Sequence, residues 1–236
     1  MEKSAWQLFK ESQNNNIILK KEKEKWDPKP IILNFTKKEL VPGIWVYKNV
    51  FENTNKLISD IENLYGSAWQ DGQVYGGEER STNKSFRDCS VVVLNPESET
   101  TNVEQDKLYY FVKESMMQCL QDYVDSFAIG MENLTPDNWQ VLKYGHGQHF
   151  DGHADDGHRF PRTVSITAYL NDSYTGGELD YKHFNLKWKP EKGDVLIFPS
   201  NYVYNHKVHP VGTGLRYALV NWFRWKTMSV DMLPND

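Results

Sequence analysis

A change in hydrophobic periodicity near Thr135-Pro136 constrains the fold of this chain most strongly. Beyond that point, apolar and polar residues alternate in short runs, as they do in half-buried β-strands. The runs cover residues 139–144, 163–170, 178–184, 195–198, 203–208 and 216–225. Turn sequences divide several of them, at Gly176-Gly177, Lys192-Gly193-Asp194 and Gly212-Thr213-Gly214. Short strands without helices between them predict an antiparallel sandwich or barrel and not a parallel sheet.

Two helices are predicted before this point. In residues 52–65 the apolar residues at helical spacing are Leu57, Ile58, Ile61 and Leu64, with Asn53 or Thr54 as the candidate N-cap. Residues 106–127 carry a longer stripe of Leu108, Val112, Met116, Cys119, Leu120, Tyr123 and Phe127. We interpret its Met and aromatic members as core packing and not as a cofactor site.

The run 163–170 has two chemically different faces. Val164, Ile166, Ala168 and Leu170 share one face, and Thr163, Ser165, Thr167 and Tyr169 share the other. A polar stripe on a central strand either faces solvent or lines a polar cavity. The histidine chemistry described below favours the cavity.

Composition excludes several classes of protein. The 236 residues include 8 Trp, 13 Tyr and 11 Phe, enough to bury a sizeable core, so wholesale disorder is excluded. The net charge of −5 does not favour nucleic acid or an anionic membrane as partner, and no apolar run is long enough for a transmembrane helix. Two cysteines cannot make a disulfide scaffold, so we expect a cytoplasmic protein. We expect a charged extension over residues 1–30 and a single domain over 31–236.

The spacing of His153 and Asp155 is the first sign of a metal site. In an extended chain, positions i and i+2 point the same way, so an imidazole nitrogen and a carboxylate oxygen can meet one ion. A third ligand must come from elsewhere, and His206 in the run 203–208 is the candidate. A hairpin centred on the turn at 210–214 would place His206 opposite Arg216, roughly 5 Å apart at Cβ. A cation beside the metal suits a small dianion that chelates the metal at one end.

Two histidines and one carboxylate leave open positions on a metal, which is typical of non-haem Fe(II) oxygenases. A zinc site built on His149 and His153 is the alternative. It is disfavoured because no HExxH glutamate is present and the region is expected to pass from loop to strand. His209 is expected to point away from the metal, because it lies three residues after His206.

Several segments in order resemble the prolyl 4-hydroxylase family of Fe(II)/2-oxoglutarate dioxygenases. Residues 144–155, YGHGQHFDGHAD, resemble the family's YxxGQxYxxHxD segment. The further matches are Arg162-Thr163, Tyr169-Leu170-Asn171, Gly176-Gly177-Glu178-Leu179, the GDVLIFP stretch 193–199, His206 with Pro210-Val211, and Arg216. The resemblance covers about residues 139–225.

This resemblance implies a mostly β fold with supporting helices, a double-stranded β-helix (jelly-roll, cupin-like) whose N-terminal helices pack on one sheet. It implies Fe(II), 2-oxoglutarate and O2 as cofactor and co-substrates, with ascorbate as a possible support. By the same resemblance, the metal ligands and catalytic residues are His153, Asp155 and His206. Arg216, Tyr169 and Tyr144 match residues that hold 2-oxoglutarate, and Arg162 and Trp222 match residues that contact the target proline.

The resulting prediction is a dioxygenase that hydroxylates a prolyl residue in a peptide or protein while it converts 2-oxoglutarate to succinate and CO2. The polar loop 73–84 is a candidate mobile lid. The alternatives are the same chemistry on a lysyl residue, a free amino acid or another small molecule, and a non-enzymatic cupin-like metal-binding module. A nucleic-acid demethylase is disfavoured, because its second arginine finds only Arg224 at a different spacing.

Overall fold

The structure is a computed structural model that describes residues 35–76, 79–94, 102–158 and 160–226. In these ranges the helices are α2 (Thr54–Tyr65), α3 (Val103–Ser126) and the 3-10 helices η1 (Met131–Asn133), η2 (Lys182–Phe184) and η3 (Tyr202–Tyr204). The strands before residue 130 are β1 (Thr36–Val41), β2 (Ile44–Lys48), β3 (Gln70–Asp71), β4 (Val74–Gly76), β5 (Glu79–Ser81), β6 (Arg87–Asp88) and β7 (Ser90–Leu94). The later strands are β8 (Leu134–Pro136), β9 (Trp139–Tyr144), β10 (His149–His153), β11 (Val164–Tyr169), β12 (Thr175–Gly176), β13 (Leu179–Tyr181), β14 (Leu186–Trp188), β15 (Val195–Pro199), β16 (His206–Val208), β17 (Val211–Thr213) and β18 (Arg216–Trp225).

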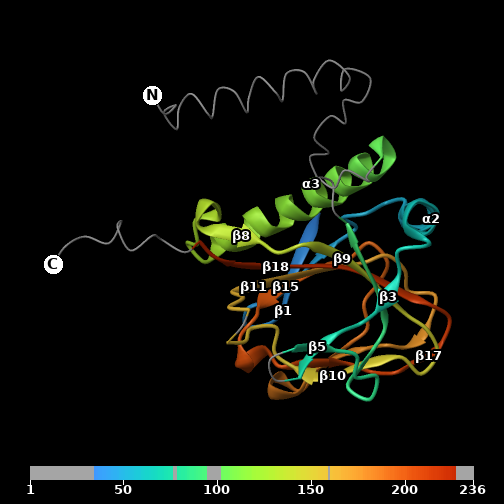
Figure 1. The fold of residues 1–236 in the computed structure, drawn as a ribbon. Coiled ribbons are helices and arrows are strands. Elements are labelled where there is room, and N and C mark those ends of the chain that lie inside the picture. The colour runs from blue at the N-terminus through green and yellow to red at the C-terminus, as the bar shows by residue number, and fades with distance from the viewer. Residues whose placement is uncertain (1–34, 77–78, 95–101, 159, 227–236) are drawn as a thin grey trace, which may run out of the picture. The chain divides into compact units, whose positions relative to one another are not determined.

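Two antiparallel sheets of unequal size carry the fold within the described residues (Figure 1). The larger sheet has the strand order β1-β2-β15-β11-β18-β9-β7-β3, with β8 paired to one end of β18. The smaller sheet has the order β14-β13-β16-β10-β6. Strands close in sequence fall in different sheets, so the chain passes repeatedly from one sheet to the other. The predicted jelly-roll is confirmed.

The two faces of the larger sheet serve different purposes. Along β11, Val164, Ile166 and Ala168 belong to the hydrophobic cluster that contains both helices. Tyr169, on the opposite face, belongs to a second cluster shared with the smaller sheet. The alternation predicted for this strand is therefore confirmed, and its polar face points into the space between the sheets.

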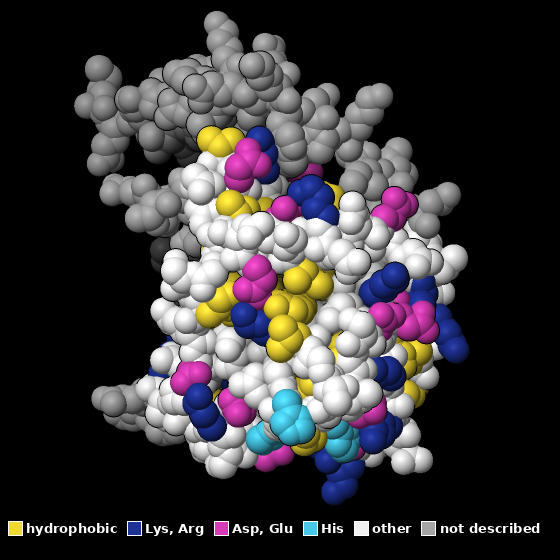
Figure 2. All heavy atoms as spheres, turned by 90° about the vertical axis from the view of Figure 1, so that its right-hand side faces the viewer, with side chains coloured by type: hydrophobic (Ala, Val, Ile, Leu, Met, Phe, Trp, Pro, Cys, Tyr) yellow, Lys and Arg dark blue, Asp and Glu magenta, His cyan; other side chains and the backbone are white. Residues whose placement is uncertain are grey.

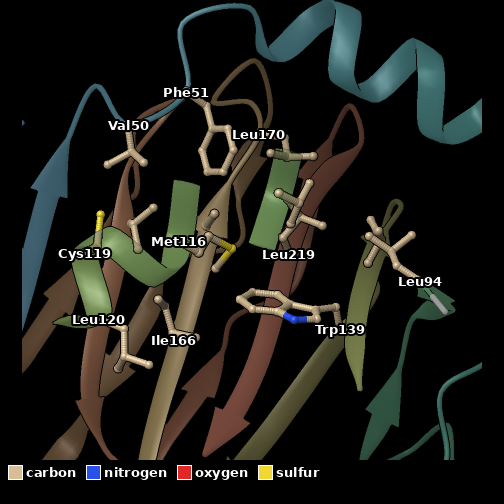
Figure 3. Packing of buried hydrophobic residues seen from close by; sticks show 14 of the residues in the cluster. Val50, Phe51, Leu94, Met116, Cys119, Leu120, Trp139, Ile166, Leu170 and Leu219 are labelled. Atoms are coloured by element: carbon tan, nitrogen blue, oxygen red, sulfur yellow. The ribbon is translucent and has the colours of Figure 1, made fainter. Parts of the chain in front are cut away.

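Helices α2 and α3 cover the outer face of the larger sheet. Figure 3 shows Met116, Cys119 and Leu120 of α3 packed over Ile166 and Leu219 of the sheet. These side chains are buried, as the helical stripe predicted, and Cys119 is a free thiol. The last member of the stripe, Phe127, is 46% exposed and lies beyond the end of α3.

Helix α3 begins at Val103, three residues before the predicted start at residue 106. The Asn102 side chain accepts hydrogen bonds from the backbone N–H groups of Glu104 and Gln105, and the Gln105 side chain accepts one from the Asn102 backbone. This capping box satisfies donors that the first helical turn leaves free. Gln105 also donates to the Leu64 carbonyl oxygen at 2.9 Å, which ties the start of α3 to the end of α2.

Two strand predictions need correction. The run 203–208 is a strand only from His206, because residues 202–204 form η3, and the run 178–184 ends at Tyr181, where η2 begins. The hairpin that was predicted to pair His206 with Arg216 is wrong. Strand β16 pairs with β10 and β13, whereas Arg216 of β18 lies opposite Tyr144 of β9 in the other sheet. The intervening strand β17 pairs with β12, so the chain crosses between sheets where a simple turn was expected.

The predicted extension over residues 1–30 lies outside the described residues, and the boundary at residue 31 stays a prediction. In the part that is described, no helix has the length and apolar character needed to cross a membrane. The loop 73–84 contains the short strands β4 and β5, which pair with each other.

The packing of α3 on the sheet predicts a specific loss of stability. Truncating the fully buried Met116 to Ala should lower the free energy of unfolding by about 2–5 kcal/mol, because the smaller side chain leaves a cavity between α3 and the sheet. Glu114→Ala, at an exposed position of the same helix, should change it by less than about 0.5 kcal/mol. Urea denaturation of both variants measures the difference, and equal values would contradict this packing.

Candidate functional site

Three side chains of the kinds that bind metal ions meet between the two sheets. His153 ends β10, and His206 begins β16, where the two residues are cross-strand partners. Asp155 follows β10 two residues after His153. One ligand atom from each residue lies within 4.8 Å of the others, and no second group of this kind exists among the described residues. The structure brings together His153 and Asp155, as their spacing predicted, and the pairing of β10 with β16 brings His206 to them.

The two imidazoles are oriented by backbone carbonyls. Nδ1 of His153 lies 2.8 Å from the Asp151 carbonyl oxygen, and Nδ1 of His206 lies 3.1 Å from that of Tyr204. When Nδ1 carries the proton it donates to these carbonyls, which leaves Nε2 of both rings free to bind a metal. Two neutral imidazoles and one carboxylate suit a ferrous ion with open coordination positions.

Ser165 orients the carboxylate. Its hydroxyl donates to Asp155 Oδ2 at 2.6 Å and also lies 2.8 Å from the Ser200 hydroxyl. Both serines are buried, so these bonds are shielded from water. Asp155 Oδ1 remains 3.5 Å from His153 Nε2, on the metal-facing side. The alternation of 163–170 placed Ser165 on the polar face, but its bond to Asp155 appears only in the folded chain.

The site favours a neutral His206 and an ionised Asp155. Burial, followed by repulsion from His153, lowers the pKa of His206 to about 4. Burial alone would raise the pKa of Asp155, but the hydrogen bond from His153, the attraction to the imidazoles in their protonated form and the hydrogen bond from Ser165 hold it well below its usual range. These are the protonation states in which His206 and Asp155 can bind a metal.

A small chamber extends inward from the three candidate ligands. Its wall includes His153, Asp155 and His206, and its far side is formed by Arg216, Tyr144, Tyr169, Tyr181 and Thr167. The side chains come from both sheets. Strands β16 and β18 are not paired, yet Arg216 and His206 both line this chamber. The two side chains are therefore close together, as predicted, although the predicted hairpin does not form.

Arg216 is a buried cation without a carboxylate partner in the described part of the chain. Its side chain is 2% exposed, and its Nε makes no hydrogen bond. The rings of Tyr144 and Tyr169 lie 5.0 and 5.3 Å from the guanidinium carbon. Gly177, at φ +64°, packs so closely that a Cβ there would lie 3.0 Å from Arg216 Cδ. A buried charge is costly unless it is paired, so this chamber suits the distal carboxylate of a small dianion such as 2-oxoglutarate.

An open cleft of about 510 Å³ lies on the other side of the ligands. It shares His153, Asp155, Trp222, Phe150 and Arg87 with the chamber. The outer lining includes the cations Arg80 and Arg162 and the rings of Phe86 and Phe160. A molecule in the cleft and one in the chamber would therefore approach the same metal.

Arg162 and Trp222 meet at the mouth of this cleft. The Arg162 guanidinium carbon lies 3.7 Å from the Trp222 ring centroid, and Nε donates to Asp137 Oδ2 at 3.0 Å. Trp222 shares one face of β18 with Arg216, as their spacing predicted, because both line the chamber. Asp137 has no motif around it, and sequence reasoning missed its role in fixing Arg162.

The other candidate histidines lie outside the group formed by His153, Asp155 and His206. His209 lies 3.0 Å from Asp180 Oδ2, and His149 contacts the carbonyls of Gly147 and Ser85. His149 and His153 both belong to strand β10, so the helical spacing that a zinc pair needs is absent from this segment. Arg224, the only candidate second arginine of a nucleic-acid demethylase, lies 3.6 Å from Asp137 and is 46% exposed.

Comparisons with known proteins agree with this geometry. Residues 139–224 match the sequence model of the 2OG-Fe(II) oxygenase superfamily. A PKHD-type hydroxylase of Prochlorococcus marinus is 25% identical over 187 residues, which cover 76% of each chain. One of Idiomarina loihiensis is 28% identical over 118 residues, which cover 46% of this chain and only 53% of that relative. The match thus spans about half of the second relative's length.

Solved structures share the fold. A prolyl hydroxylase from Trichoplax adhaerens, solved with a peptide fragment of the hypoxia inducible factor oxygen degradation domain, has a TM-score of 0.63 at 18% identity and 94% coverage of both chains. A prolyl-4-hydroxylase from Pseudomonas putida has a TM-score of 0.57 at 18% identity, covering 78% of this chain and 94% of that one.

The ligand set predicts how metal affinity responds to mutation. His206→Ala should weaken binding of Mn(II), a redox-stable substitute for Fe(II), by more than about 100-fold, because it removes a direct ligand. His209→Ala removes a nearby histidine that is bonded to Asp180 and should leave the affinity unchanged. Titration calorimetry measures both, and equal losses would contradict the assignment of ligands.

The low pKa of His206 predicts acid sensitivity of the metal-free fold. Between the ordinary value of 6.5 and about 4, the unfolded chain carries a proton on His206 that the folded chain does not. Acidification in this window therefore favours unfolding, by about 2 kcal/mol between pH 6.5 and pH 5. Urea denaturation at several pH values, with a chelator present, measures this loss of stability. In His206→Asn the free energy of unfolding should depend less on pH in this window. A pH dependence that is unchanged in that variant would assign the effect to other groups.

Proposed function

We propose that this chain, a prolyl 4-hydroxylase-like member of the 2OG-Fe(II) oxygenase superfamily, hydroxylates a prolyl residue in a peptide or protein substrate. The observation that carries the proposal is the buried Arg216 chamber behind the cluster of His153, Asp155 and His206. A protein that only stored metal would not need a desolvated guanidinium beside the ligands. This speaks against the cupin-like metal-binding module.

The residues divide into two binding functions. His153, Asp155 and His206 would hold Fe(II), while Arg216 would pair with the distal carboxylate of 2-oxoglutarate. Tyr169 and Tyr144 flank the guanidinium. Burial raises the pKa of both phenols, so at neutral pH they remain protonated and can donate hydrogen bonds to an anion. Bound iron would use O2 as the oxidant and 2-oxoglutarate as the co-reductant, so that one oxygen atom would enter the substrate C–H bond and the other would enter succinate, formed together with CO2.

The protein itself would position the metal ligands and shield the co-substrate from water. Ser165 holds the Asp155 carboxylate, and the carbonyls of Asp151 and Tyr204 hold the imidazoles. The apolar walls of the chamber, among them Leu179, Phe198 and Val208, exclude water from the co-substrate. Retention of a carboxylate at position 155, in place of a small residue that would admit halide, favours hydroxylation.

Substrate would enter through the outer cleft. Trp222 lines both the cleft and the chamber, so its ring offers an apolar surface for a proline next to the metal. Arg162 stacks on that ring and is held by Asp137, which makes it a preorganised hydrogen-bond donor. A cleft of about 510 Å³ has room for a short peptide segment. The same chemistry on a lysyl residue or a free amino acid remains the alternative to exclude.

The proposed reaction predicts Fe(II)-dependent formation of succinate from 2-oxoglutarate in the presence of a proline peptide. His206→Ala and Asp155→Ala should abolish it, and His209→Ala should retain it. Mass spectrometry should find one added oxygen on proline. Turnover that survives strict removal of iron would refute the mechanism, and oxidation of free amino acids or lysyl peptides alone would refute the substrate.

Arg216 predicts a separate effect on co-substrate binding. Arg216→Met should raise KM for 2-oxoglutarate by about 10–100-fold, because it removes a charge-assisted pair made by a buried guanidinium. Arg216→Lys should restore part of the affinity, since it keeps the charge and loses only the bidentate geometry. Mn(II) affinity should remain as in the wild type in both variants. A KM that is unchanged in Arg216→Met would assign the anion to another site.

A further inference from the structure

The outer cleft is more cationic than the rest of the protein. The chain has a net charge of −5, and acidic and basic side chains are interleaved over the face shown in Figure 2. The cleft lining, by contrast, contains Arg80, Arg87 and Arg162. Its acidic members are Asp71, which is paired with Lys84 at 3.0 Å, and the metal-facing Asp155. Positive charge therefore remains at the place where a substrate would bind.

Arg87 is the member of this lining whose charge is least compensated. No carboxylate in the described part of the chain lies within ion-pair distance of it, and its buried Nε makes no hydrogen bond. The hydrogen bond that Arg87 does make runs from Nη1 to the Gln73 carbonyl oxygen at 2.9 Å, which leaves the positive charge in place. By comparison, the charge of Arg162 is balanced by Asp137 at 3.0 Å.

The ring of Phe150 lies between Arg87 and the candidate metal ligand His153. Its guanidinium carbon lies 4.8 Å from the Phe150 ring centroid, and the Phe150 ring stacks on His153 with centroids 3.6 Å apart. Arg87 and Phe150 are also cross-strand partners in β6 and β10, so the stack is fixed by the backbone. Because an extended peptide advances about 3.3 Å per residue, a side chain one or two positions from the reacting residue reaches Arg87.

Arg80 and Phe160 extend the same chemistry along the cleft. The Phe160 ring centroid lies 5.9 Å from the Arg80 guanidinium carbon and 5.4 Å from that of Arg162. Aromatic faces and guanidinium groups thus alternate along the lining. Such a surface combines apolar contact with attraction for negative charge.

We propose that the cleft binds an acidic peptide segment, in which an Asp or Glu one or two positions from the hydroxylated residue pairs with Arg87. This inference rests on the proposed function for the position of the reacting residue, and it specifies which substrates that site selects. The Arg87 guanidinium can donate a charge-assisted hydrogen bond to a carboxylate, whereas a lysine in the substrate would be repelled. Arg80 contributes additional positive potential, which assists the approach of an acidic chain.

The test is a binding measurement on the full chain loaded with Mn(II) and 2-oxoglutarate. Fluorescein-labelled peptides share one central proline and differ only in the residues beside it, which are Glu, Gln or Lys. We expect the Glu peptide to bind about tenfold more tightly than the Gln peptide and the Lys peptide to bind most weakly. Raising the salt concentration should narrow these differences. Equal affinities of the three peptides would overturn the inference.

Variants assign the preference to Arg87. Arg87→Gln should abolish the advantage of the Glu peptide while it leaves the affinity for the Gln peptide within about twofold, and Arg87→Lys should retain part of the advantage. Lys56→Gln removes one positive charge from α2, outside the cleft, and should change nothing. Circular dichroism of each variant verifies folding. A preference that persists in Arg87→Gln would overturn the assignment.

Two outcomes separate this inference from the proposed function. Acidic peptides that bind through Arg87 without hydroxylation at proline would support the cleft preference and refute the prolyl substrate. Proline peptides that are hydroxylated with no dependence on flanking charge would refute the preference alone. A labelled single-stranded oligonucleotide serves as a competing polyanion, and tighter binding of it through Arg87 would overturn the peptide assignment.

Discussion

The burial of Arg216 is the constraint on which the functional part of this fold depends. A guanidinium that is 2% exposed, with no carboxylate partner in the described chain, is costly unless an anion joins it. The two sheets hold it in place, since β18 provides the arginine and the smaller sheet closes the chamber opposite. The fold thereby keeps a buried positive charge next to three side chains that could hold a metal ion. This arrangement favours a dianion that binds metal and arginine at the same time.

Strand β11 shows how one element serves both stability and chemistry. Its apolar face packs under α3, and its polar face presents Ser165 to the Asp155 carboxylate at 2.6 Å. The helices cover the large sheet from outside, so they stabilise the strands without entering the chamber (Figure 3). Rigid packing on one face therefore positions ligands on the other. Hydrogen bonds to Asp155 and to both imidazoles complete this support.

The chamber and the cleft differ in what they exclude. The chamber is walled by tyrosines and aliphatic side chains from both sheets, which suits a small co-substrate that must be kept from water. The cleft is open, and its lining alternates arginines with rings. His153, Asp155 and Trp222 belong to both spaces. Selection of the substrate can thus vary through the cleft while the chamber and the ligands stay the same.

The local pattern of the chain determined much of this protein. Strand alternation predicted the β-rich second half, the helical stripes predicted α2 and α3, and the spacing of His153 and Asp155 predicted that these two side chains meet, although Asp155 lies beyond the end of β10. These features depend on backbone geometry over a few residues, and that geometry is the same wherever the segment lies. The resemblance to a known family added the jelly-roll and pointed to His206 and Arg216.

Only the tertiary structure decided which distant segments meet. Arg216 lies opposite Tyr144 and not opposite His206, because the chain between β16 and β18 crosses from one sheet to the other. Ser165 reaches Asp155, Asp137 fixes Arg162, and Arg87 reaches the metal site through Phe150. Each of these contacts joins residues whose separation in the chain carries no regular period. They follow from strand register and from side-chain packing across the sheets, which no local spacing encodes.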